Sequence, residues 1–204
     1  WWDHIAFSIK TARQRQFKLS YPSNLDVDLT ANGVEKSLDD VLRLYKSPLN
    51  KDADRFIREL MQEARSEALP GTLRRFLNWE EAREMIAGGM AIGSHTHSHP
   101  VLGQLELEEQ RKELALSRAR LIENLGVDID ALAYPVGDTN SYSAQTQQIA
   151  NETGYQVAFS FHGGSNLAGA IAPFDVKRVG VGYQSRIRFR VQAEIYRSTG
   201  RYLP

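Results

Sequence analysis

Three of the five histidines in this 204-residue chain lie at alternate positions, as His95, His97 and His99 of the segment Gly-Ser-His-Thr-His-Ser-His-Pro. Imidazole rings this close together repel one another when protonated, and they cost free energy when buried without a partner. A divalent metal removes both costs because it takes a neutral imidazole nitrogen as ligand. The spacing alone leaves three interpretations open: a metal site, a buried polar cluster, or unrelated surface histidines.

The residues around the histidines predict their local backbone. Pro100 predicts an extended conformation at His99, because a residue before proline avoids the helical region. The segment is therefore expected to be an ordered turn. The chain also has no His-Glu-x-x-His sequence, which disfavours a thermolysin-like protease.

Elements that alternate between strand and helix must position these histidines. A short apolar strand is predicted at Met90–Ile92, directly before them. The further predictions are strands at 131–134, 155–161 and 174–182, helices at 107–125 and 143–153, and a basic helix at 184–198. This order indicates a parallel α/β fold, in which chemistry collects at the carboxyl ends of strands. The histidine segment and the segment 134–140 both begin at such an end, so we expect them to lie together.

The overall composition excludes some classes of function. Lys plus Arg and Asp plus Glu number 25 each, so no net charge favours nucleic acid or an anionic membrane as a partner. No apolar run approaches membrane-spanning length. Cysteine is absent, which excludes thiolate metal sites and fits either redox environment. The cell envelope and the cytoplasm both stay open as locations.

Residues 78–105 resemble the second motif of the NodB-homology polysaccharide deacetylases, carbohydrate esterase family 4. The family pattern His-[Ser/Thr]-x-x-His-[Pro/Ser] is filled here by residues 95–100. The resemblance implies that His95 and His99 are ligands of a divalent metal, with zinc favoured. It implies that Thr96 braces the loop through a hydrogen bond and that His97 is not a ligand.

Residues 131–140, Ala-Leu-Ala-Tyr-Pro-Val-Gly-Asp-Thr-Asn, resemble the family's third motif, Arg-x-Pro-[Tyr/Phe]. Ala133 replaces the arginine and Val136 replaces the aromatic residue, while Pro135 is kept. The family uses the backbone N–H at the aromatic position to hold an oxyanion, and a backbone donor survives a change of side chain. The resemblance therefore implies a catalytic role for Val136 N–H. A further match at 154–166 implies that His162 is the general acid.

The resemblance implies a distorted (β/α)7 barrel and a metal-dependent hydrolase that removes N-acetyl groups from an amino-sugar polysaccharide. Residues 77–204 are interpreted as the C-terminal part of the barrel, and residues 1–76 as a helical and hairpin insertion within the domain. The family's first motif, Thr-Phe-Asp-Asp, supplies the catalytic base and the third ligand, and the chain does not contain it. We therefore expect a chain truncated before that motif, with an incomplete barrel and weak or no activity alone.

The chain offers two candidates for the carboxylates that would serve as catalytic base and third metal ligand. The pair Asp39-Asp40 falls inside a predicted amphipathic helix, with Ser37 and Asp40 as its capping box, and is interpreted as a decoy. Asp138, close to the third motif, is the nearest carboxylate in sequence that could substitute. The alternatives to a deacetylase are a non-catalytic carbohydrate-binding domain or pseudoenzyme with a degenerate site, and a purely structural metal site.

Overall fold

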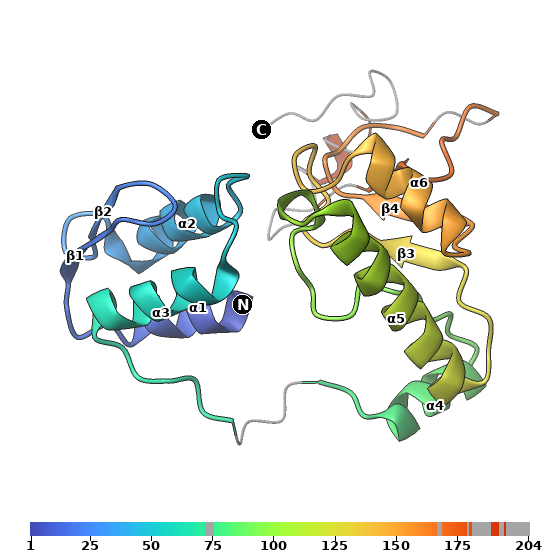
Figure 1. Cartoon of the computed structure of the whole chain (residues 1–204), viewed down its shortest axis with the longest axis horizontal. Coiled ribbons are helices and arrows are strands. Elements are labelled where there is room, and N and C mark those ends of the chain that lie inside the picture. Colours follow the sequence, from blue (N-terminus) through green and yellow to red (C-terminus); the bar gives the residue numbers. More distant parts are fainter. Residues whose placement is uncertain (72–75, 167–168, 179, 181–188, 192–193, 195–204) are drawn as a thin grey trace. The chain divides into compact units, whose positions relative to one another are not determined.

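The computed structural model describes residues 1–71, 76–166, 169–178, 180, 189–191 and 194. The chain divides into two compact units, Trp1–Phe76 and Leu77–Pro204; helices α1–α6 and strands β1–β4 are labelled in Figure 1. That the first unit is an insertion within the domain stays a prediction. Among the described helices, none combines the length and the apolar character needed to span a bilayer.

The first unit packs helices against a small hairpin. Its elements are α1 (Trp2–Lys10), β1 (Gln16–Leu19), β2 (Leu25–Asp28), α2 (Gly33–Tyr45) and α3 (Ala53–Ala64). The strands pair antiparallel, with Phe17 opposite Val27. Ile5, Phe56 and Leu60 are almost fully buried, so this unit has a hydrophobic core of its own.

Helix α2 carries the Asp39-Asp40 pair, and its start differs from the prediction. The helix begins at Gly33, so Ser37 lies inside it and is buried; the predicted capping box at Ser37 and Asp40 is wrong. Asp40 accepts a hydrogen bond from Lys36 at 2.8 Å, which lowers the pKa of its carboxyl. The pair therefore lies within a helix and not after a strand, as the sequence predicts.

The second unit contains a parallel sheet with helices packed against it (Figure 1). Its elements are α4 (Trp79–Ala87), η1 (Leu102–Gln104), α5 (Leu107–Leu125), β3 (Ala131–Ala133), α6 (Ala144–Glu152), β4 (Val157–Ser160) and β5 (Val176–Lys177). Among the described residues the strand order is β3-β4-β5, and both pairings are parallel. Residues 179 and 181–188, which include part of the predicted last strand and the start of the basic helix, lie outside the described residues.

The strand predicted at Met90–Ile92 is wrong. Met90 N–H donates to Met85 O of α4 at 3.0 Å. This donor is therefore used to end the helix and is not paired with a strand. The chain joins the sheet later, through an isolated parallel bridge between Ser94 and Leu132. Gly93 permits this approach, because a Cβ there would lie 3.1 Å from Ala131 O.

Helix boundaries in the second unit follow from capping residues. Asn78 and Glu81 form a capping box at the start of α4, which satisfies backbone donors that the first turn leaves unpaired. Helix α5 ends at Gly126, which has a φ of 68°, a conformation in which glycine carries no side-chain penalty.

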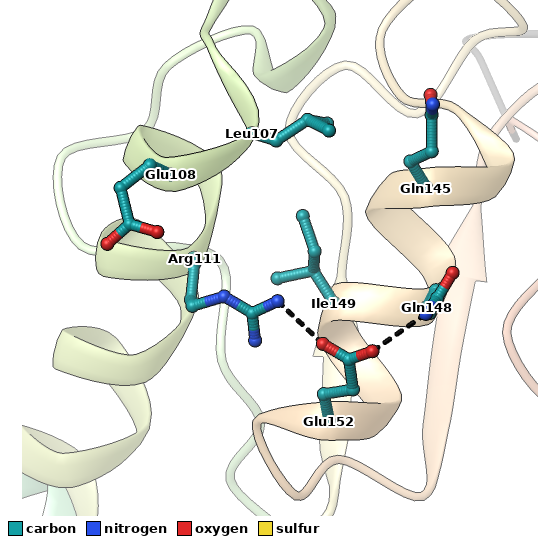
Figure 2. Close-up of a pocket in the computed structure, with 7 residues that line it drawn as sticks. All are labelled: Leu107, Glu108, Arg111, Gln145, Gln148, Ile149 and Glu152. Atoms are coloured by element: carbon teal, nitrogen blue, oxygen red, sulfur yellow. Dashed lines mark hydrogen bonds and ion pairs between the residues drawn. The ribbon is translucent and has the colours of Figure 1, made fainter.

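Helices α5 and α6 pack together and contribute to one core. Leu114 of α5, Ile149 of α6 and Leu132 of β3 are buried in the same hydrophobic cluster. At the surface between the helices, Figure 2 shows a small pocket where Arg111 of α5 reaches Glu152 of α6. This ion pair is 2.6 Å long and about 40% exposed, so it contributes little to stability.

Candidate metal centre

Segments that follow neighbouring parallel strands meet at one edge of the sheet. His95 follows Ser94, which is bridged to β3; Pro135 and its neighbours follow β3, and His162 follows β4. Phe161 N–H donates to Gly137 O at 2.7 Å, which joins the second and third segments directly. Parallel pairing therefore gathers the residues of both sequence motifs at the carboxyl ends of the strands.

The ring of His95 is oriented by the backbone of β3. Its Nδ1 lies 2.6 Å from the carbonyl oxygen of Ala133. A carbonyl only accepts, so Nδ1 carries a proton, and whenever the ring is neutral its lone pair lies on Nε2. Backbone carbonyls orient metal-binding histidines in this way.

His99 directs its ring at the same point. Its Nε2 lies 3.1 Å from His95 Nε2, and the ring centroids are 4.7 Å apart at an interplanar angle of 72°. Two nitrogens bound to one tetrahedral zinc at about 2.0–2.1 Å lie about 3.3 Å apart, so the pair has the separation that a shared ion requires. Burial, and then the nearby charge of His95, lower the pKa of His99 and favour the neutral form that binds metal.

The backbone of the histidine loop is a tight turn with an unexpected conformation at His99. Thr96 and His99 have φ values of 67° and 61°, so the extended backbone predicted at His99 is wrong. His99 N–H donates to Thr96 Oγ1 at 3.1 Å, the bracing bond that the family resemblance predicts. The turn therefore holds the His99 amide at the threonine hydroxyl while the His99 ring lies beside that of His95.

Glu113 of α5 holds the outside of this loop, and the sequence motifs do not reveal it. Its Oε2 accepts from the backbone N–H groups of His97 and Ser98, at 2.9 and 2.8 Å. Its Oε1 accepts from Ser98 Oγ at 2.7 Å. The middle of the loop is therefore anchored through its backbone, while the His97 side chain is exposed.

The turn after β3 presents a backbone donor. Val136 has a φ of 64°, and Gly137 N–H donates back to Pro135 O at 2.7 Å. Among the described residues, no backbone acceptor is paired with Val136 N–H. Gly137 is required here, because a Cβ at that position would lie 2.8 Å from Phe161 N.

His162 belongs to a polar cluster that includes Asp175, a residue the sequence did not single out. His162 Nε2 lies 3.1 Å from Asp175 Oδ1, and Tyr142 OH donates to the same oxygen at 2.8 Å. Burial opposes ionisation of Asp175, but hydrogen bonds from Ser160, Tyr142 and His162 outweigh it and lower the pKa of the carboxyl. Spacing along the chain gives no signal for this contact, which depends on β4 and β5 lying side by side.

In the described part of the chain, no third side chain is placed to bind a metal together with His95 and His99. No group of three or more His, Cys, Asp or Glu side chains among the described residues is arranged to hold a metal. The Asp138 carboxylate accepts from Asn140 N–H at 3.0 Å within its own turn. The structure thus brings His95 and His99 together without a carboxylate ligand.

Comparison with known proteins identifies the family. The sequence profile of the family described as polysaccharide deacetylase matches residues 53–158, just over half of the chain. The Bacillus subtilis (strain 168) protein named "Putative polysaccharide deacetylase YxkH" is 33% identical over 90 residues, which are 44% of this chain and 31% of that protein. The chain therefore spans about a third of the length of this curated relative.

Solved structures are also similar. BC0361, a polysaccharide deacetylase from Bacillus cereus, matches with a TM-score of 0.50 and 18% identity, over 69% of this chain and 47% of that one. The Streptococcus pyogenes deacetylase PplD, solved in complex with acetate, matches with a TM-score of 0.49 and 28% identity, over 54% of this chain and 47% of that one.

The predicted α/β architecture, a NodB-type barrel represented in part, is confirmed by the parallel sheet and by the likeness to BC0361. The histidine loop and the third-motif turn both fall inside the matched range. The chain belongs to the polysaccharide deacetylase family.

Proposed function

We propose that this chain is part of a metal-dependent hydrolase that removes N-acetyl groups from an amino-sugar polysaccharide, and that His95 and His99 hold its divalent ion. The observation that carries the proposal is the 3.1 Å separation of their Nε2 atoms, with His95 Nδ1 committed to Ala133 O. Imidazole ligands suit zinc among the common divalent ions, so zinc is the favoured metal. Membership of a family that deacetylates polysaccharide supports the reaction type.

The reaction is hydrolysis of an amide C–N bond in the N-acetyl group. A divalent ion, when bound, would polarise the acetyl carbonyl and activate a water molecule. Val136 N–H would donate to the oxyanion that forms when water attacks the carbonyl carbon. Among the described residues this N–H has no backbone acceptor, and its place at the carboxyl end of β3 supports the role.

His162 would protonate the departing amine. Its Nε2 faces the ionised Asp175, so that nitrogen donates to the carboxylate and Nδ1 remains to carry the transferred proton. Asp175 would act as a positioning residue that fixes the orientation of the ring. The amine nitrogen leaves with the proton, and acetate is the second product.

The catalytic base and the third metal ligand would come from outside the described residues. The chain has no Thr-Phe-Asp-Asp sequence, and no carboxylate joins the imidazole pair among the described residues. We therefore propose that this chain alone binds metal weakly and releases little or no acetate.

The experiment compares this chain with the full-length product of its gene. Acetate release from N-acetylglucosamine oligomers is measured with and without a chelator, and zinc affinity is measured by competition. His95→Ala and His99→Ala should each weaken zinc binding by more than the roughly 10–100-fold that loss of an outer-shell partner costs. His97→Ala is the matched control for zinc affinity and should leave it unchanged, because the family pattern has a variable residue at this position. A rate of acetate release that is unchanged both by the chelator and by His95→Ala would disprove the metal mechanism.

A second candidate is a carbohydrate-binding domain without catalysis. Ala133 and Val136 replace the residues that the family pattern has there. A pocket of about 310 Å³ beside His95 is lined by Trp79, His97 and Arg120, among others, and aromatic and arginine side chains suit a sugar. This candidate is favoured if the full-length gene product binds N-acetylglucosamine oligomers, releases no acetate, and loses binding on Trp79→Ala.

A further inference from the structure

We propose that Glu113 is a positioning residue for the imidazole pair, and that it holds the loop between His95 and His99 so that both Nε2 atoms face one point. The proposal rests on the proposed function for its purpose, although the ring geometry is measurable without metal. Glu113 lies on α5, outside both sequence motifs.

The contacts of Glu113 hold two successive peptides, Thr96–His97 and His97–Ser98. The carboxylate accepts both backbone N–H groups on Oε2 and the Ser98 hydroxyl on Oε1, over 2.7–2.9 Å. Hydrogen bonds to an ionised acceptor are roughly twice as strong as those between neutral groups. Because both oxygens are used, the carboxylate restrains the orientation of these two peptides as well as their position.

The loop needs an external restraint because its backbone is strained. Thr96 and His99 flank the anchored residues His97 and Ser98, and both have a positive φ. Residues other than glycine rarely adopt this conformation. A backbone of this kind persists only when surrounding contacts over-determine it. The Thr96–His99 hydrogen bond closes the loop from within, and Glu113 supplies three bonds from a different element.

Helix α5 is a rigid support for this carboxylate. Leu114, the next residue, is fully buried, so packing fixes the helix at this point. One turn later, Ser117 Oγ lies 2.8 Å from Ser94 Oγ at the base of the loop. Residues four apart share a helix face, so one face of α5 contacts both the base and the middle of the histidine loop.

The test compares the full chain with its Glu113→Gln and Glu109→Gln variants, free of metal. Glu109 lies one turn earlier on α5 and is exposed, so it is a matched control. The ring centroids of His95 and His99 are 4.7 Å apart, and their ring protons should show a nuclear Overhauser effect. We expect this effect in the wild type and in Glu109→Gln, and its loss in Glu113→Gln.

The second readout is zinc affinity, measured by competition with a chelator. Glu113→Gln should weaken affinity about 10–100-fold, as expected for an outer-shell partner, and Glu109→Gln should stay within about twofold of wild type. Should Glu113→Gln fail to fold, Ser98→Ala removes one of the three bonds without altering α5, and it should weaken affinity in the same direction by a smaller factor.

The two proposals fail in different ways. If the wild type binds no zinc, the proposed metal site is disproved. If the His95–His99 ring contact is nevertheless present in the wild type and lost in Glu113→Gln, the positioning role is supported. A folded Glu113→Gln that keeps the ring contact overturns the positioning role, and so does a Glu113→Gln that binds zinc as tightly as Glu109→Gln. Wild-type affinity in Ser98→Ala, where Glu113→Gln is unfolded, also overturns it.

Discussion

Three of the four non-glycine residues with positive φ in the described part of the chain belong to the candidate site: Thr96, His99 and Val136. Each such residue costs of order 1–3 kcal/mol and persists only where neighbouring contacts enforce it. The other, Arg65, is the C-cap of α3, where a left-handed residue commonly ends a helix. Backbone strain in the described part of the chain is therefore concentrated at the candidate site.

Asp175 gives a prediction on pH at the same scale. Its pKa in the folded chain is lower than its ordinary value, so the ionised form stabilises the fold. That contribution is present above the ordinary pKa of about 3.9 and is lost as the pH falls through the lowered value. The difference in free energy of unfolding between wild type and Asp175→Asn should therefore be larger at pH 6 than at pH 3.

Urea unfolding at the two pH values measures this difference. Tyr142→Phe is a useful comparison, because it removes one of the hydrogen bonds to Asp175 Oδ1 and should reduce the pH dependence without abolishing it. An Asp175→Asn difference that is the same at pH 6 and pH 3 would contradict the assignment of the ionised form.

At the scale of elements, the turn after β3 depends on close approach between two backbones. Gly137 has a φ of 75°, and a Cβ there would lie 2.8 Å from Phe161 N and 3.0 Å from its Cβ. Gly137→Ala should therefore lower the free energy of unfolding by about 2–4 kcal/mol, from conformational strain and overpacking together.

Gly126→Ala separates these two causes. Gly126 has a similar φ of 68°, and a Cβ there would meet nothing within 4 Å. Its replacement should cost only about 1–2 kcal/mol, from the left-handed backbone alone. Denaturant unfolding of both variants provides the comparison, and equal losses would show that the contact with Phe161 is relieved at no cost.

At the scale of the whole molecule, zinc binding and folding should be coupled. The rings of His95 and His99, the proposed ligands, are held together in the folded chain, so zinc should stabilise the folded state. At a free zinc concentration 100 times the measured Kd, the expected gain is about 2.7 kcal/mol. Thermal unfolding should show a higher midpoint with zinc for the wild type and for His97→Ala, and no zinc-dependent change for His99→Ala.

The sequence alone identified the histidine pair and the order of strands and helices. The histidine segment stands out because three histidines in five positions are costly without a ligand, and the family resemblance selects His95 and His99 among them. Helix α5 matches its predicted range because its apolar spacing and Gly126 are local signals. The strand at Met90–Ile92 was predicted wrongly, because an apolar run does not reveal that Met90 N–H is already used by the end of α4.

Only the tertiary structure decided which side chains support the site. Glu113 lies on α5, which follows the histidine loop, and Asp175 lies directly before β5, whereas His162 follows β4. Their contacts therefore depend on how α5, β4 and β5 pack. The φ of His99 was also decided there, because the bond to Thr96 and the restraint by Glu113 outweigh the preference of a residue before proline. Residue types and spacing determine which groups can bind a metal, whereas long-range packing determines whether their lone pairs converge.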